Sequence, residues 1–157
     1  MGEHVDSALR RAAVMALGEL GRSSDYRDRA DAGRGLAGFA ETEEAAGPLL
    51  ELVLDREDTF VTRATAEALL RRHDKAGLTA VASALAVAGP NHGDWIHTAV
   101  HDAFAVYADE RDDAMRLCEE LAGDPDERVA LGARELHESL AGINCVLHPA
   151  QRGGTQP

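Results

Sequence analysis

The sequence predicts an all-α fold, a right-handed α-solenoid (superhelix) of about three to four stacked helical hairpins. Apolar residues make up 45% of the 157 residues but aromatic residues only 4%, so the core must consist mainly of Ala, Leu and Val. Such side chains favour close helix packing over a β-sandwich, which needs aromatic and β-branched strands. A repeat of 34 to 35 residues is the second observation, because this period is typical of helical-hairpin solenoids.

The clearest hairpin covers residues 55–88. Its first half has apolar residues at helical spacing, namely Phe60, Val61, Ala64, Ala68 and Leu69. Its second half has the same kind of stripe, at Leu78, Val81, Ala82 and Leu85. A polar turn at His73 and Asp74 separates the two helices. Because neither helix can bury its stripe alone, the hairpin needs similar neighbours on both sides.

Three helices are expected before this hairpin, over residues 3–20, 25–40 and 43–54. The first is expected to bury one apolar side, made of Val5, Leu9, Ala12, Ala13, Ala16, Leu17 and Leu20. The second contains three glycines, which lower its helix propensity: Gly33, Gly35 and Gly38. Close packing between helices is the favoured explanation for them, and a hinge is the alternative. The third tolerates Pro48 near its first turn, where no N–H is needed.

Three more helices are expected after the hairpin. A loop rich in Gly and Pro over residues 89–94 precedes a helix over residues 95–108. Helices over residues 110–122 and 126–141 follow, with an aspartate in the turn between them. Residues 1–141 are therefore predicted to form one domain. The remaining stretch, residues 142–157, is predicted to be a largely disordered tail because Gly, Pro, Gln and Thr dominate it.

The repeat becomes visible when the openings of these helices are aligned. Arg29-Ala30, Arg63-Ala64 and Thr98-Ala99 recur 34 and 35 residues apart, and Arg128-Val129 fits about one period later. Three fragments, residues 9–21, 43–70 and 123–140, resemble bacterial HEAT-repeat proteins of the short-repeat, phycobilin-lyase-like type. The resemblance covers about residues 5–141. It implies a curved stack with a concave, protein-binding face lined by the second helices, here residues 43–54, 75–88 and 110–122.

The charge distribution suggests what such a face could bind. The formal charge is −12, with 28 acidic and 16 basic residues, and this surface would repel nucleic acid. A basic protein or peptide is the expected partner, although acids can also serve solubility alone. Residues 41–58 contain seven acids and one base, and residues 109–127 nine acids and two bases. The candidate contact residues are Glu51, Asp55, Asp113, Glu119 and Glu120, together with Trp95 as an interface anchor or a packing plug.

A histidine cluster provides an alternative from a different functional class. His97 and His101 lie at positions i and i+4, so they share a helix face and could bind one metal ion with His92 as a third ligand. A metal-binding protein or metal-dependent enzyme would be centred there. Half-buried histidines that bond neighbouring carbonyls or Asp102 are the structural alternative.

The rest of the sequence favours a non-enzymatic binding protein without a cofactor. It contains no GxSxG motif, no P-loop and no Rossmann fingerprint. Two cysteines, Cys118 and Cys145, form no CxxC pair and imply no disulfide framework. We found no signal peptide and no membrane-spanning stretch in the sequence, so a cytoplasmic monomer or homodimer is expected.

Overall fold

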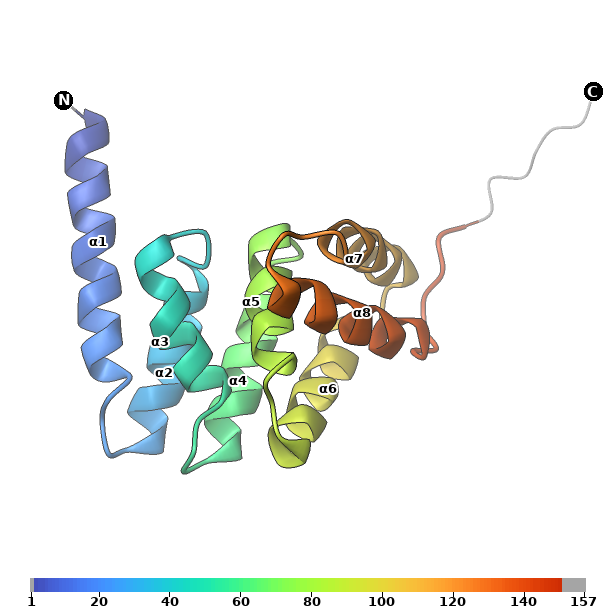
Figure 1. The fold of residues 1–157 in the computed structure, drawn as a ribbon, viewed down its shortest axis with the longest axis horizontal. Coiled ribbons are helices and arrows are strands. Elements are labelled where there is room, and N and C mark those ends of the chain that lie inside the picture. Colours follow the sequence, from blue (N-terminus) through green and yellow to red (C-terminus); the bar gives the residue numbers. More distant parts are fainter. Residues whose placement is uncertain (1, 151–157) are drawn as a thin grey trace, which may run out of the picture.

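The computed structural model describes residues 2–150, and this part of the chain consists of eight α-helices (Figure 1). The prediction of an all-α protein is therefore confirmed. The bounds of the helices are α1 (Gly2–Leu20), α2 (Tyr26–Ala37), α3 (Glu43–Val53), α4 (Thr59–Leu70), α5 (Lys75–Leu85), α6 (Pro90–Phe104), α7 (Ala108–Leu121) and α8 (Glu127–Ala141). None of these helices combines the length and the apolar character that spanning a bilayer requires.

The helices pack mostly against their neighbours in sequence. α2, α4 and α6 lie side by side in one row, and α3, α5 and α7 form a second row beside it. Their shared core consists of aliphatic side chains and a single fully buried large aromatic ring, Phe104. Ala and Leu dominate this core, as the low aromatic content predicted.

Aspartate side chains cap the N-termini of several helices. Asp25, Asp58 and Asp126 each accept a hydrogen bond from the backbone N–H two residues later, at the beginning of α2, α4 and α8. Such caps satisfy N–H groups that have no partner inside the helix. The start of α6 differs from the prediction, because residues 90–94 form its first turns instead of a loop. Pro90 occupies an early helical position, where a proline fits without losing a hydrogen bond.

Glycines allow two pairs of helices to approach closely. A Cβ atom on Gly33 of α2 would collide with the side chain of Thr65 on α4, and a Cβ on Gly35 would lie 2.8 Å from Leu17 on α1. These two glycines therefore serve packing, as favoured from the sequence. Gly38 is exposed and follows the last residue of α2.

The position of α8 differs from the simple repeat. Its opening sequence aligns with those of α2 and α4, yet α8 packs mainly on α5 and α7 rather than continuing the row of α6. Gly132 makes this crossing possible, because a Cβ there would collide with the carbonyl oxygen of Ala82 on α5. Figure 1 shows α8 running across the end of the helix array.

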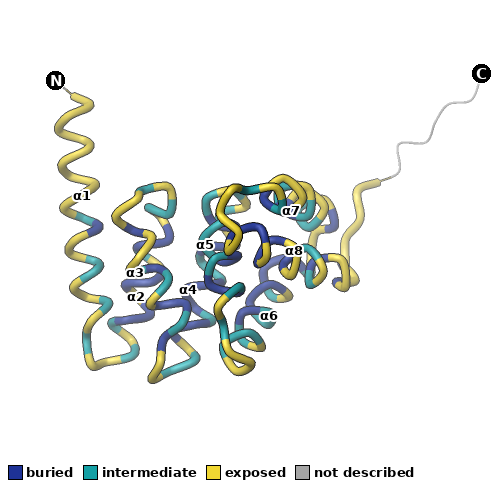
Figure 2. Tube along the Cα trace, viewed as in Figure 1, coloured by how far each residue is buried: buried dark blue, intermediate teal, exposed yellow. Residues whose placement is uncertain are grey.

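The prediction for α1 was wrong about which side is buried. Only Val14 of this helix is buried, and Val5, Leu9, Ala12, Ala16 and Leu20 of the predicted apolar side are exposed. Figure 2 shows α1 as the least buried helix, at the N-terminal edge of the array. Helical periodicity shows that a helix is amphipathic, but it does not show whether a neighbour covers its apolar side.

The chain remains folded beyond residue 141. Ile143 and Cys145 are buried, and the Cys145 thiol donates a hydrogen bond to the carbonyl oxygen of Phe104. The backbone of Leu147 pairs with the α6–α7 connection, donating to Val106 O at 2.8 Å and accepting from Ala108 N at 2.9 Å. The predicted disordered tail therefore does not begin at residue 142, and its last part, residues 151–157, lies outside the described residues.

Candidate functional site

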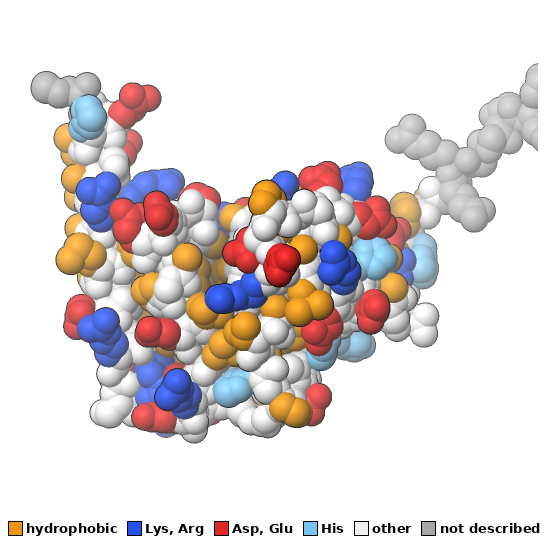
Figure 3. Space-filling model, in the orientation of Figure 1, with side chains coloured by type: hydrophobic (Ala, Val, Ile, Leu, Met, Phe, Trp, Pro, Cys, Tyr) orange, Lys and Arg blue, Asp and Glu red, His pale blue; other side chains and the backbone are white. Residues whose placement is uncertain are grey.

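An apolar groove with a volume of about 590 Å³ lies between α3, α5 and the α7–α8 turn. Figure 3 shows hydrophobic side chains gathered in a hollow near the middle of this face of the molecule. The groove belongs to the row of helices that the sequence predicted to be the binding face. Its apolar and small lining residues are Ala40, Ala46, Gly47, Leu49, Leu50, Ala76, Thr79, Ala80, Ser83 and Leu121.

The polar groups of this groove leave its floor apolar. The hydroxyls of Thr79 and Ser83 donate back to carbonyls of α5, at 2.7 Å and 2.9 Å, so neither needs a partner in the groove. The charged lining residues are two acids and two bases, Glu41, Asp124, Lys75 and Arg128. The centre of the predicted binding face is therefore apolar, with a rim of balanced charge, rather than acidic.

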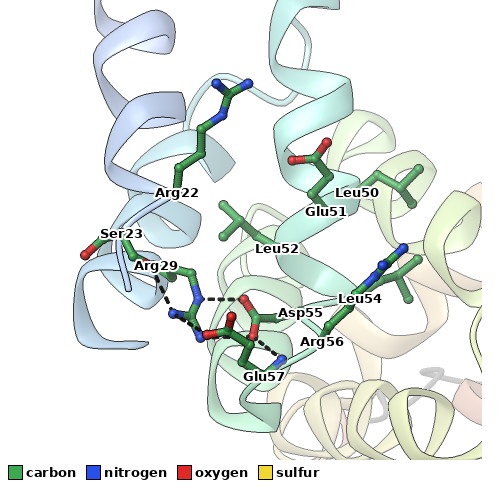
Figure 4. A pocket seen from close by; sticks show the side chains of 11 residues that line it. Arg22, Ser23, Arg29, Leu50, Glu51, Leu52, Leu54, Asp55, Arg56 and Glu57 are labelled. Atoms are coloured by element: carbon green, nitrogen blue, oxygen red, sulfur yellow. Dashed lines mark hydrogen bonds and ion pairs between the residues drawn. The ribbon is translucent and has the colours of Figure 1, made fainter. Parts of the chain in front are cut away.

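A second hollow, of about 580 Å³, lies between the α1–α2 turn, α3 and the α3–α4 turn. Figure 4 shows Arg29 of α2 reaching across it to Asp55 and Glu57. Arg29 Nε donates to Asp55 Oδ2 at 2.8 Å and Nη2 to Asp55 Oδ1 at 3.2 Å, and both side chains are 7% exposed. Arg29 Nη1 also donates to the carbonyl oxygens of Ser23 and Ser24, so the ion pair joins three segments of the chain.

The Arg29–Asp55 pair stays charged across the neutral pH range. Burial alone would raise the pKa of Asp55, but hydrogen bonds from Arg29 and from the backbone N–H groups of Asp58 and Glu57 outweigh it and lower that pKa. The hydrogen bond to Asp55 likewise raises the pKa of Arg29, against the effect of burial. A catalytic acid or base needs a pKa near the working pH. This pair therefore suits a structural connection rather than proton transfer.

The predicted acidic contact residues are dispersed, and most have partners within the chain. Asp55 is buried against Arg29, which leaves it unsuitable for a direct contact with another protein. Asp113 pairs with Arg116 at 2.9 Å, Glu119 with His137 at 3.2 Å and Glu120 with Lys75 at 3.8 Å. Glu51 is exposed on α3 and lines the second hollow instead of the groove. Of these residues, Glu120 alone pairs with a groove-lining side chain, that of Lys75.

The three candidate metal ligands on α6 have separate surroundings. His92 Nε2 lies 2.7 Å from the carbonyl oxygen of Asp55. His97 contacts α8, with Nδ1 at 3.0 Å from Ser139 Oγ and Nε2 at 3.2 Å from Glu135 Oε1, whereas His101 is exposed. Within residues 2–150, no group of three or more His, Cys, Asp or Glu side chains is arranged to hold a metal ion. Trp95 is half-buried on the same helix.

Sequence reasoning missed the residues that form the groove. Ala76, Thr79, Ala80 and Ser83 follow one another at helical spacing along α5, on a side different from the stripe of Leu78, Val81, Ala82 and Leu85. Small side chains on the second side of a helix that already has an apolar stripe are the signal that could have identified them. Leu121 and Arg128 line the groove because the α7–α8 turn lies beside α5, where α8 packs. The repeat did not predict this packing of α8 on α5.

Comparisons of the chain with protein-family models, with curated proteins and with solved structures found no match.

Proposed function

We propose that this protein is a non-enzymatic adaptor of HEAT-like solenoid type that binds an amphipathic helix of a basic partner protein. The two rows of sequentially packed helices support the solenoid assignment. The apolar side of the partner helix lies in the groove between α3, α5 and the α7–α8 turn. The basic side of the partner helix remains outside the groove, where the acids of α7 attract it.

The apolar groove is the observation that carries this proposal. Small side chains on α5 allow another helix to approach its backbone closely, and the partly exposed Leu50, Ala76 and Ala80 supply apolar surface for it to cover. Grooves of this kind bind helices through apolar anchors at positions i, i+3, i+4 and i+7 of the ligand. A catalytic pocket would instead need convergent polar or titratable groups, and the hydroxyls here are bonded to their own helix.

The charge of the chain supports a basic partner. Asp113, Glu119 and Glu120 are exposed on α7, and their pairing with Arg116, the half-buried His137 and Lys75 is weak in water. Together with the net charge of −12, they attract a basic protein and speed its association, while the groove supplies most of the affinity.

The test uses a library of random peptides displayed on phage and selected on the wild-type protein. The peptides expected to be enriched carry apolar residues at i, i+3, i+4 and i+7 and basic residues on the other side. Ala80→Trp fills the groove and should weaken their binding about tenfold or more, because the anchor side chains lose their space. Fluorescence anisotropy with synthetic copies of the selected peptides measures the dissociation constants.

Val87→Trp is the matched control, because Val87 is 51% exposed just beyond α5 and is not part of the groove. This variant should bind the peptides as the wild-type protein does, and circular dichroism checks that both variants are folded. Peptides without a helical apolar pattern, or equal binding to Ala80→Trp, would show that the groove is not the binding site.

A further inference from the structure

The outward side of α1 is an apolar surface that none of the other helices within residues 2–150 covers. Val5, Leu9 and Leu20 are 58%, 63% and 37% exposed, and Ala12 and Ala16 between them are exposed as well. Hydrophobic side chains line this edge of the molecule in Figure 3. Scattered apolar residues on a surface need no explanation, but a continuous stripe of this length marks an interaction site.

The inward side of α1 is held in place, so the helix cannot simply rotate to bury its stripe. Val14 is 2% exposed, and Leu17 packs against the core next to Gly35 of α2. Arg10 and Arg11 form ion pairs with Glu41 and Glu44, each at 3.2 Å. Rotating α1 to bury its stripe would place charged side chains of this helix in the core and expose Val14. Arg10 and Arg11 thus face the protein while the apolar stripe of α1 faces outward.

We propose that this stripe is a dimer interface, in which α1 of one copy packs antiparallel against α1 of a second copy. The stripe fits a two-fold axis near Ala12. Reversing the helix about this point places Val5 opposite Leu20 and Leu9 opposite Ala16, so that the large side chain at Leu9 meets a small one. The same rotation brings His4 of one copy near Glu19 of the other, since both lie along one edge of the stripe at helical spacing.

The size of the surface agrees with this occupant. A helix of 19 residues is about 28 Å long and about 10 Å wide, which is about 280 Å² in projection; because protruding side chains make the accessible area larger, two paired copies bury at most roughly 1,000 Å² in total. That area is close to the minimum for a specific interface. A self-complementary stripe favours a second copy over an unrelated protein, because one surface supplies both halves of the contact. This inference is independent of the groove, which lies on a different row of helices.

Multi-angle light scattering and sedimentation velocity of the full chain over a concentration series test the dimer. The mass expected at high concentration is twice 16.7 kDa, and it should persist in high salt because the contact is apolar. Leu9→Glu should raise the dissociation constant of the dimer about tenfold or more, because it places two carboxylates in the contact. Leu131→Glu on α8 is the control, since Leu131 is 54% exposed and lies away from α1. It should leave the dimer intact.

A double variant, Val5→Cys with Leu20→Cys, tests the antiparallel arrangement. Oxidation should cross-link its dimers, because each new thiol faces the other one across the two-fold axis. Both native cysteines are free and buried, so they do not compete. A wild-type protein that stays monomeric at all concentrations, or dimers that are unaffected by Leu9→Glu, would overturn the proposal.

Discussion

Arg29 and Asp55 connect parts of the chain that are distant in sequence. The pair fixes the start of α2 against the α3–α4 turn, and Asp55 Oδ1 also accepts the backbone N–H groups of Glu57 and Asp58. Removing one partner from such a buried pair leaves the other charge without compensation. Replacing both partners by apolar side chains of similar size costs much less. The energetic role of the pair can therefore be separated from that of either residue alone.

Asp55→Asn is expected to lower the free energy of unfolding by about 3 kcal/mol, because Arg29 remains charged and buried with only the exposed carboxylate of Glu57 to compensate it. Asp113→Asn serves as the control, since that residue is exposed beside Arg116, and its effect should stay below about 0.5 kcal/mol. Urea unfolding followed by circular dichroism measures both. Similar effects for the two variants would contradict a structural role for Asp55.

The pH dependence of stability provides an independent check on the same pair. Because the pKa of Asp55 is lowered in the folded protein, its contribution is fully present above the ordinary aspartate pKa of about 4. The contribution is lost as the pH falls through the folded-state value. The difference in unfolding free energy between the wild-type protein and Asp55→Asn should therefore shrink below about pH 4. A difference that stays constant there would argue against this explanation.

The sequence could not distinguish Asp55 from the other acids around it. All seven acids between residues 41 and 58 look alike in composition, and Arg29, the partner that buries Asp55, lies 26 residues earlier. Asp55 is buried and Glu51 is exposed, and this difference in burial arises only from tertiary packing. The histidines show the same limit, because the i, i+4 spacing of His97 and His101 gives no information about the contacts of His97 with α8.

Among the helices, the crossing of α5 and α8 depends most on a single side chain. Gly132 lies against the backbone of Ala82, where a methyl group has no room and where rigid backbone, rather than a flexible side chain, must move. Gly93 on α6 differs in this respect, because a Cβ there would meet nothing within 4 Å. The two positions are a matched pair for testing close packing against helix propensity.

Gly132→Ala is expected to destabilise the protein by about 3 kcal/mol, because α8 must move away from α5 and the core between them opens. Gly93→Ala should instead stabilise it by about 0.5 to 1 kcal/mol through better helix propensity. Thermal unfolding measured by calorimetry compares the two variants. A Gly132→Ala protein as stable as the wild type would mean that α8 and α5 leave room for a methyl group at their crossing.

Element prediction from the sequence worked where local signals were strong. The bounds of α3 and α8 differ from the predicted ones by one residue, since a threonine or aspartate precedes each and an apolar stripe runs along it. The prediction failed at the start of α6, where Gly and Pro were read as a loop although both fit the first turn of a helix. It also failed for the buried side of α1, because burial depends on which neighbours exist.

At the scale of the whole molecule, the two ends of the helix array differ. α1 leaves its outer side open, whereas the C-terminal end is covered by α8 and by residues 143–147. Arg111 of α7 donates to the carbonyl oxygen of Ile143 at 2.7 Å, which holds this last segment in place. The repeat predicted stacked hairpins, but it contains no information about how the stack ends.

A chain that ends after residue 141 should be less stable than one that ends after residue 150. The shorter chain loses the buried side chains of Ile143 and Cys145 and the backbone bonds of residues 146 and 147, which together contribute about 3 kcal/mol. Urea unfolding of both chains gives the difference. Equal midpoints would show that the segment contributes nothing to stability.

The return of α8 to α5 has a consequence for the order of folding during synthesis. Helices α2 and α4 cover one another soon after both have left the ribosome, because they are close in sequence. The side of α5 that packs on Gly132 has to wait for residues made about 50 positions later, which takes roughly 3 to 10 s at typical elongation rates. During that interval the apolar side chains of α5 are open to chaperones and to other nascent chains. The N-terminal half is thus able to fold step by step, whereas the C-terminal half closes in one late event.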